Sequence, residues 1–337
     1  MEQHSNDKQA IQIKNPHDRF CRRTVFHPLY ASDFLKSCGD SVLTDCVDLD
    51  HLQEAPTTHL SNELKEVLVD AALTTRLRDT NSTSEILFIL EHKSRPSRTV
   101  ALQLLAEAAS SLRSRWLLCK RPESGNFKPP IPLMIVVYNG SEDWDGEIWF
   151  HDLFPDLPEE LREFVPQFRV IFINLRRFKY GNLPGRPETQ AIVEAMMRAT
   201  DGTFIDHLSG VLQRVVKSDL NEHLQFDLAK TISIYYSLTA KATAEQLAQA
   251  VSTVFKGPEY IKMIEEIKDC YILEGIEIGE LKGRIKDILA LLQFRFAQVP
   301  DEIAIELNKR TDLTALHSLF ALAYNCTSLD EFANALK

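Results

Sequence analysis

An acid and a base follow directly after an apolar run near residue 90. Residues Ile86 to Leu90 form a continuous hydrophobic segment, which is typical of a strand buried on both faces. Glu91 and Lys93 come next, and because side chains alternate along a strand they share one face, while His92 points to the other. A charged pair at the end of a buried strand indicates a functional site.

A third charged residue is expected to join this pair. Residues 67–77 have the composition of a second strand that carries one acid, Asp70, and the turn formers of residues 79–82 follow it. A hairpin folded at this turn brings Asp70 beside Glu91 and Lys93. Carboxylates are the hard oxygen ligands that Mg²⁺ prefers, and a lysine ammonium can offset the charge of a phosphate group. The residue types therefore fit metal-assisted chemistry on a phosphate ester.

The elements that position these residues predict an α/β domain. A helix begins at the Asn15-Pro16 pair and is interrupted at Pro28, and Ser97 is expected to cap a later, longer helix. The expected order of elements is a helix, strands, a helix and a strand. This order predicts a mixed sheet flanked by helices, in which a crossover helix leads the chain back to the sheet. The expected elements cover residues 15–39, 67–77, 86–92, 98–118, 131–138 and 168–175.

The second part of the chain has a helical pattern from about residue 187 onward. Capping boxes are expected at Thr243 to Gln246 and at Ser328 to Glu331. The sequence therefore predicts an α/β domain followed by an all-helical C-terminal region. The expected divisions are a disordered tail over 1–14, the α/β domain over 15–200, a helical extension over 201–257 and the C-terminal helices over 258–337.

Composition limits the classes of partner. The net charge of −10 argues against a protein that binds nucleic acid over its whole surface. Residues 93–121 nevertheless carry a local excess of positive charge that includes Arg95 and Arg98. These two arginines are the expected nucleic-acid contacts, although such a cluster can equally be a solvated helix face.

No apolar run approaches the ~20 residues that cross a bilayer, so no membrane partner is expected. The six cysteines are scattered, which is typical of reduced thiols in a cytoplasmic protein.

Motifs along the first two hundred residues carry a resemblance to a known family. They are Asn15-Pro16-His17-Asp18-Arg19-Phe20, Ala31-Ser32-Asp33-Phe34-Leu35, Val47-Asp48-Leu49-Asp50, Leu90-Glu91-His92-Lys93-Ser94, Ala101-Leu102 with Leu104, Ile131-Pro132-Leu133 and Tyr138-Asn139-Gly140. In this order they resemble the recombination-promoting nuclease family, also called the YhgA-like transposases, over about residues 14–200. The resemblance implies a PD-(D/E)XK restriction-endonuclease-like core and a magnesium-dependent DNA endonuclease linked to recombination.

The resemblance also implies a catalytic set, Asp70, Glu91 and Lys93. Asp70 and Glu91 are the implied Mg²⁺ ligands, together with the main-chain carbonyl of His92, and Lys93 is expected to orient the attacking water. An acid from the first helix often completes such a site, and Asp18 is the first choice for it, with Asp33 as the second. Asp18 can equally be an acid that the dipole favours near a helix N-terminus.

Two departures from the family pattern leave other functions open. Around the acid the chain has Val69-Asp70-Ala71-Ala72-Leu73 where members often have Ser-Asp-Leu-Leu-Tyr, and Asn139 stands where His is commoner. The altered flank of Asp70 supports a second hypothesis, a catalytically inactive, nuclease-derived DNA-binding or scaffold protein. A third is a transposase that joins strands, for which no helix-turn-helix is evident. The C-terminal helices are expected to serve homo-oligomerisation or partner contact.

Overall fold

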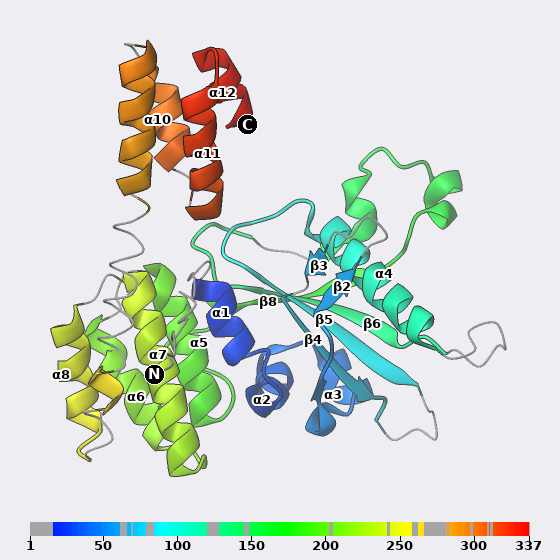
Figure 1. Ribbon diagram of the computed structural model, residues 1–337. Helices are drawn as coiled ribbons and strands as arrows, with labels where there is room; N and C mark the ends of the chain where they lie inside the picture. Colours follow the sequence, from blue (N-terminus) through cyan, green and yellow to red (C-terminus); the bar gives the residue numbers. More distant parts are fainter. Residues whose placement is uncertain are drawn as a thin grey trace, which may run out of the picture. The chain divides into compact units, whose positions relative to one another are not determined.

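The chain forms two compact units in the computed structural model (Figure 1). The larger unit spans Asn15–Ile264, and the smaller one contains Glu265–Lys337. The expected tail over 1–14 and the expected turn at 79–82 lie outside the described residues. The structure describes residues 16–60, 66–68, 70–78, 84–119, 128–144, 148–201, 205–240, 243–257, 262–265, 281, 283–296, 299–308, 310 and 313–336.

A six-stranded mixed sheet of order β1-β4-β5-β6-β8-β7 forms the centre of the larger unit. Strand β4 is antiparallel to β5, whereas β5, β6 and β8 run parallel, and the short strands β1 and β7 join antiparallel at the edges. This confirms the expected mixed α/β sheet. The strands are β1 (Gln53–Glu54), β4 (Ala71–Arg76), β5 (Glu85–Lys93), β6 (Ile131–Tyr138), β7 (Ile148–Trp149) and β8 (Arg169–Asn174).

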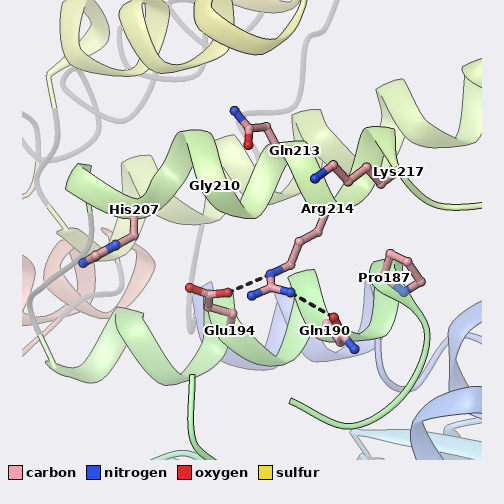
Figure 2. Close-up of a pocket in the computed structure, with 8 residues that line it drawn as sticks. All are labelled: Pro187, Gln190, Glu194, His207, Gly210, Gln213, Arg214 and Lys217. Atoms are coloured by element: carbon pink, nitrogen blue, oxygen red, sulfur yellow. Dashed lines mark hydrogen bonds and ion pairs between the residues drawn. The ribbon is translucent and has the colours of Figure 1, made fainter. Parts of the chain in front are cut away.

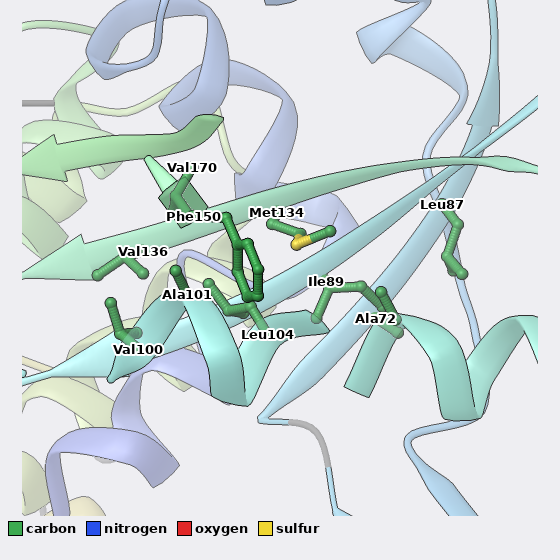
Figure 3. Close-up of a cluster of buried hydrophobic side chains, with 11 residues drawn as sticks. Ala72, Leu87, Ile89, Val100, Ala101, Leu104, Met134, Val136, Phe150 and Val170 are labelled. Atoms are coloured by element: carbon green, nitrogen blue, oxygen red, sulfur yellow. The ribbon is translucent and has the colours of Figure 1, made fainter. Parts of the chain in front are cut away.

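Helix α4 (Val100–Leu118) connects the parallel strands β5 and β6 and covers one face of the sheet. Leu87 and Ile89 of β5 pack against Val100 and Leu104 of α4 in the buried cluster that Figure 3 shows. The expected crossover helix is therefore confirmed. Its expected cap is wrong, because the residue before the helix is Thr99, whose side chain makes no capping hydrogen bond. A separate two-stranded sheet of β2 (Thr58–Leu60) and β3 (Glu66–Leu68) contacts α4.

The opposite face of the sheet is covered by helices from both ends of the larger unit. Helix α1 (Pro16–Arg23) packs on β5 and on α7 (Glu222–Ala240), where the Phe20 and Tyr235 rings stack with centroids 4.0 Å apart. The interrupted first helix is confirmed, since α2 begins at Pro28. Further elements are α2 (Pro28–Cys38), α3 (Ser41–Cys46), α5 (Pro187–Asp201), α6 (Ile205–Val216), α8 (Ala244–Val254) and the 3-10 helices Leu49–His51, Phe150–Leu153, Glu159–Phe164 and Leu175–Arg177.

The strand expected over residues 67–77 is divided in the structure. Its first part belongs to β3, which pairs with β2 outside the main sheet, and β4 begins only at Ala71. Asp70 lies in a bend between them. The physical reason is the carboxylate of Asp70, which accepts a hydrogen bond from the main chain of β5 and so replaces a regular ladder contact at this position.

The smaller unit is helical and has a core of its own. Buried side chains from residues 283–296, α10 (Asp301–Asn308), α11 (Leu313–Asn325) and α12 (Leu329–Ala335) pack together, with Leu292 and Phe332 fully covered. Ser328 caps α12 through the N–H of Glu331, as the capping pattern predicts. No described helix has the length and hydropathy of a bilayer-crossing segment. The cysteines within the described residues are free, and Cys270 lies outside them.

Candidate functional site

The end of β5 carries the acid and the base that the sequence analysis singles out. Glu91 is 5 % exposed, and the ammonium of Lys93 donates a hydrogen bond of 2.7 Å to its Oε1. The two side chains lie on the face of β5 that α4 covers, because Gln103 of α4 contacts both of them. The alternation argument for this pair therefore agrees with the structure.

Asp70 lies at the same end of β5. The pairing of Ala71 with Leu90 places the bend that contains Asp70 beside Glu91. The N–H of His92 donates to Asp70 Oδ2 over 3.0 Å, and Arg22 of α1 donates to its Oδ1 over 3.2 Å. Burial raises the pKa of Glu91, and the nearby negative charge of Asp70 raises it further. The structure thus brings two carboxylates and one ammonium to a single strand end.

A second pair of polar residues, on α4, extends this cluster into the protein. Gln103 Nε2 lies 2.8 Å from both Glu91 Oε1 and Glu107 Oε1, and Gln103 Oε1 accepts from Lys93 over 2.9 Å. Glu107 is buried, and its Oε2 has no hydrogen-bond partner among the described residues. Burial, followed by the charge of Glu91, raises the pKa of Glu107 to about 7. The cluster therefore has one carboxyl group that is half protonated near neutral pH.

Sequence reasoning did not identify Gln103, Glu107 or Arg22 as site residues. The sequence does contain a pattern that indicates Gln103 and Glu107. Residues four apart share a helix face, and these two polar residues interrupt the hydrophobic face of α4. A buried glutamate within such a stripe requires a partner on the sheet. Arg22 gave no comparable signal, since its contact with Asp70 depends on how α1 packs.

The opposite face of β5 holds a separate buried network around His92. Its Nδ1 lies 2.7 Å from Asp18 Oδ1, and its Nε2 lies 2.9 Å from Asn139 Oδ1. Asn139 in turn donates to the carbonyl of Met196 in α5 over 3.1 Å. Side-chain oxygens therefore contact both ring nitrogens and hold the ring in one orientation. The side chain of His92 therefore connects β5 to α1 and, through Asn139, to α5.

The acids expected to complete a metal site do not join Asp70 and Glu91. Asp18 binds the ring of His92, which points away from the Glu91 face, so its carboxylate is engaged on the other side of β5. Asp33 accepts from the main-chain N–H of Arg186 over 2.8 Å. Among the described residues, no group of three or more His, Cys, Asp and Glu side chains is arranged to hold a metal ion. A cation at this site would depend on two carboxylates and main-chain oxygen.

The loops after β5 and β6 lie close together beside this strand end. A Cβ at Gly140 would clash with the main-chain oxygen of Ser94, so a side chain is excluded at this position. Arg95 and Arg98 follow in the loop and are exposed. Neither guanidinium makes an ion pair or hydrogen bond within the described part of the chain. Two exposed cations, unpaired in the described part of the chain, therefore lie within a few residues of Lys93.

The comparisons with known proteins give one match. The sequence model of the family described as "Putative transposase, YhgA-like" matches residues 15–225, which is more than half of the chain. No curated protein and no solved structure matches the chain.

Proposed function

Because the chain belongs to the family of YhgA-like putative transposases, we propose that it is a Mg²⁺-dependent DNA endonuclease with a PD-(D/E)XK core. The observation that carries this proposal is the meeting of Asp70, Glu91 and Lys93 at the end of β5. Two acids beside a lysine are the groups that metal-assisted hydrolysis of a phosphodiester requires. The sheet order supports the proposal, since an antiparallel pair followed by a helical crossover to a parallel strand is what such a core needs.

The donor set fits a hard divalent cation. Asp70 and Glu91, with the carbonyl of His92, would hold Mg²⁺, which normally keeps several waters. Burial, followed by the negative charge of Asp70, raises the pKa of Glu91, and a bound divalent cation would oppose both effects. When bound, the ion would polarise the scissile phosphate and acidify a water molecule. This chemistry requires no further protein ligand.

The remaining roles fall to residues of the chain itself. Lys93 is held by Glu91 and Gln103, so its ammonium has a fixed position from which it can orient the attacking water. Arg22 holds Asp70 from the other side. Arg95 and Arg98, exposed and unpaired among the described residues, would bind backbone phosphates and position the DNA.

A plasmid-nicking assay tests the proposal. Wild-type protein should convert supercoiled plasmid to nicked circles with Mg²⁺ and leave it intact with EDTA. A reaction with Ca²⁺ tests whether binding of a divalent cation alone is sufficient for cleavage. Asp70→Asn and Glu91→Gln should both remove the activity, whereas Asp50→Asn, which changes an exposed acid paired with Lys36, should not. Nicking by a folded Asp70→Asn protein at the wild-type rate would reject this site.

A second function is favoured by one observation. Since no group of three or more His, Cys, Asp and Glu side chains among the described residues is arranged to hold a metal ion, a nuclease-derived DNA-binding or scaffold protein without turnover is also consistent with the site. Calorimetric titration with Mg²⁺ separates the two proposals. A nuclease should bind the ion in a manner that Asp70→Asn abolishes, whereas an inactive scaffold should release no such heat and still bind DNA.

A further inference from the structure

A polar groove lies between α5 and α6, on helices that the carboxylate site does not use (Figure 2). Its volume is about 430 Å³, within the range of small-molecule sites. His207, Gly210 and Arg214 follow one another along α6 at spacings of three and four, and Lys217 continues the row just beyond the helix end. Gln190 and Glu194 face them from α5. Two polar helix faces therefore line the groove.

The groove carries more positive than negative charge. Arg214 reaches across to α5, where its Nε lies 3.1 Å from Glu194 Oε2 and its Nη1 lies 2.9 Å from Gln190 Oε1 (Figure 2). Arg198 donates to the other oxygen of the same carboxylate over 2.8 Å. Glu194 therefore contacts two arginines, of which Arg214 lines the groove. Lys217 adds a second cation to the lining against the single carboxylate of Glu194, and its ammonium has no hydrogen-bond or ion-pair partner within the described residues.

Gly210 keeps the middle of the groove open. A glycine inside a helix costs about 1 kcal/mol relative to alanine. Here no packing inside the described structure requires it, because an added Cβ would meet no atom within 4 Å. The open space therefore lies where a ligand can approach the helix between His207 and Arg214.

We propose that this groove binds a phosphate group. Arg214 supplies a guanidinium that Glu194 and Gln190 hold in one orientation, and a planar guanidinium of fixed orientation suits the oxygens of a phosphate. Lys217 supplies an unpaired ammonium, and His207 supplies an imidazole at the other end of the row. The phosphate could belong to a small free molecule or to a nucleic-acid backbone, which share this chemistry. The proposal goes beyond the nuclease reaction and does not depend on it.

Calorimetric titration of the full chain in EDTA tests this proposal, with pyrophosphate and a short DNA duplex as probes. We expect Lys217→Gln to weaken binding about tenfold, the loss of one charge-assisted hydrogen bond. Lys256→Gln, which changes an exposed lysine elsewhere in the unit, should bind as the wild type does. Pyrophosphate binding that Lys217→Gln weakens identifies a site for free phosphates. Binding of the duplex alone, weakened by the same substitution, identifies the nucleic-acid backbone.

A pair of substitutions at Gly210 gives a second test that leaves the cations intact. Gly210→Gln and Gly210→Glu add side chains of equal size, and both are better helix formers than glycine, so both proteins should fold. Gly210→Glu should weaken pyrophosphate binding more than Gly210→Gln does, because it adds a negative charge. The proposal is overturned if neither probe binds the wild type, if Lys217→Gln has wild-type affinity, or if an acidic peptide binds in place of both phosphate probes. The use of EDTA separates these results from any failure of the carboxylate site.

Discussion

The main-chain N–H of His92 donates a hydrogen bond of 3.0 Å to Asp70 Oδ2. This contact joins the bend before β4 to the end of β5, and it holds Asp70 near Glu91 although both carry negative charge. A hydrogen bond to a carboxylate is stronger than one between neutral groups. The backbone hydrogen bond thus opposes the repulsion between Asp70 and Glu91, which adds to the effect of burial in raising the pKa of Glu91.

The hydrogen bond between His92 and Asp70 predicts different effects on stability for two substitutions at Asp70. Asparagine keeps an oxygen that can accept from the N–H of His92 but removes the charge, whereas alanine removes both. We expect both variants to lose Mg²⁺-dependent nicking. Asp70→Asn should keep the wild-type free energy of unfolding or exceed it, and Asp70→Ala should lose about 1–2 kcal/mol, because a half-buried N–H loses its partner. Urea unfolding followed by circular dichroism measures both, and equal stabilities would contradict the role of this bond.

Glu107 should make stability depend on pH in a defined direction. Its pKa is raised to about 7 by burial and then by Glu91, so in the folded protein it retains a proton that the unfolded chain releases above about pH 4.5. Its contribution is therefore most favourable below pH 4.5 and is lost as the pH rises through about 7. With about 1.4 kcal/mol for each pKa unit, the loss is on the order of 3 kcal/mol.

Glu107→Gln tests this dependence, since the amide keeps an oxygen for Gln103 and cannot ionise. The variant should match the wild type near pH 4.5 and become more stable by a few kcal/mol above about pH 7. Thermal unfolding across this range measures the difference, and Glu163→Gln, at an exposed site, is the control. A difference that does not change with pH would show that folding does not raise the pKa of Glu107.

The exposed arginines near Lys93 should determine how DNA binding depends on salt. Removing one cation that binds a phosphate reduces the slope of log affinity against log salt by about 0.9. Arg95→Gln and Arg98→Gln should each lower the slope by about one unit and weaken binding equally across DNA sequences. Fluorescence anisotropy over a salt series measures this, with Arg162→Gln, a surface arginine paired with Glu159, as the control. Unchanged slopes would mean that these arginines are solvated surface residues.

The sequence predicts the parts of the site that depend on local patterns. The apolar run before Glu91 predicts β5, and alternation predicts that Glu91 and Lys93 share a face, both of which agree with the structure. It does not predict the bend at Asp70, because a lone acid between two apolar segments is compatible with a continuous strand. The division follows from the contact with His92, which is 22 residues away in the chain.

Contacts between distant segments are what local sequence patterns do not predict. Asp18 is a plausible metal ligand by type, but it binds the ring of His92 across a separation of 74 residues. No local pattern encodes that contact, since it depends on where α1 lies against β5. Gln103 and Glu107 differ from Asp18 in this respect. Their spacing of four residues places them on one face of a buried helix, which the sequence indicates. Only their partners on the sheet could not be predicted.

Asn139 shows how one of these distant networks can be tested. The residue is fully buried, accepts from the ring of His92 and donates to the carbonyl of Met196, so it links β5, β6 and α5. Asn139→Ala should reduce the free energy of unfolding by about 2–4 kcal/mol, because it leaves two buried polar groups without this partner. Gln167→Ala, which removes an exposed amide that also donates to main-chain carbonyls, should cost less than about 1 kcal/mol. Urea unfolding compares the two variants. If they lose equal stability, the side-chain network of His92 and Asn139 does not stabilise the fold.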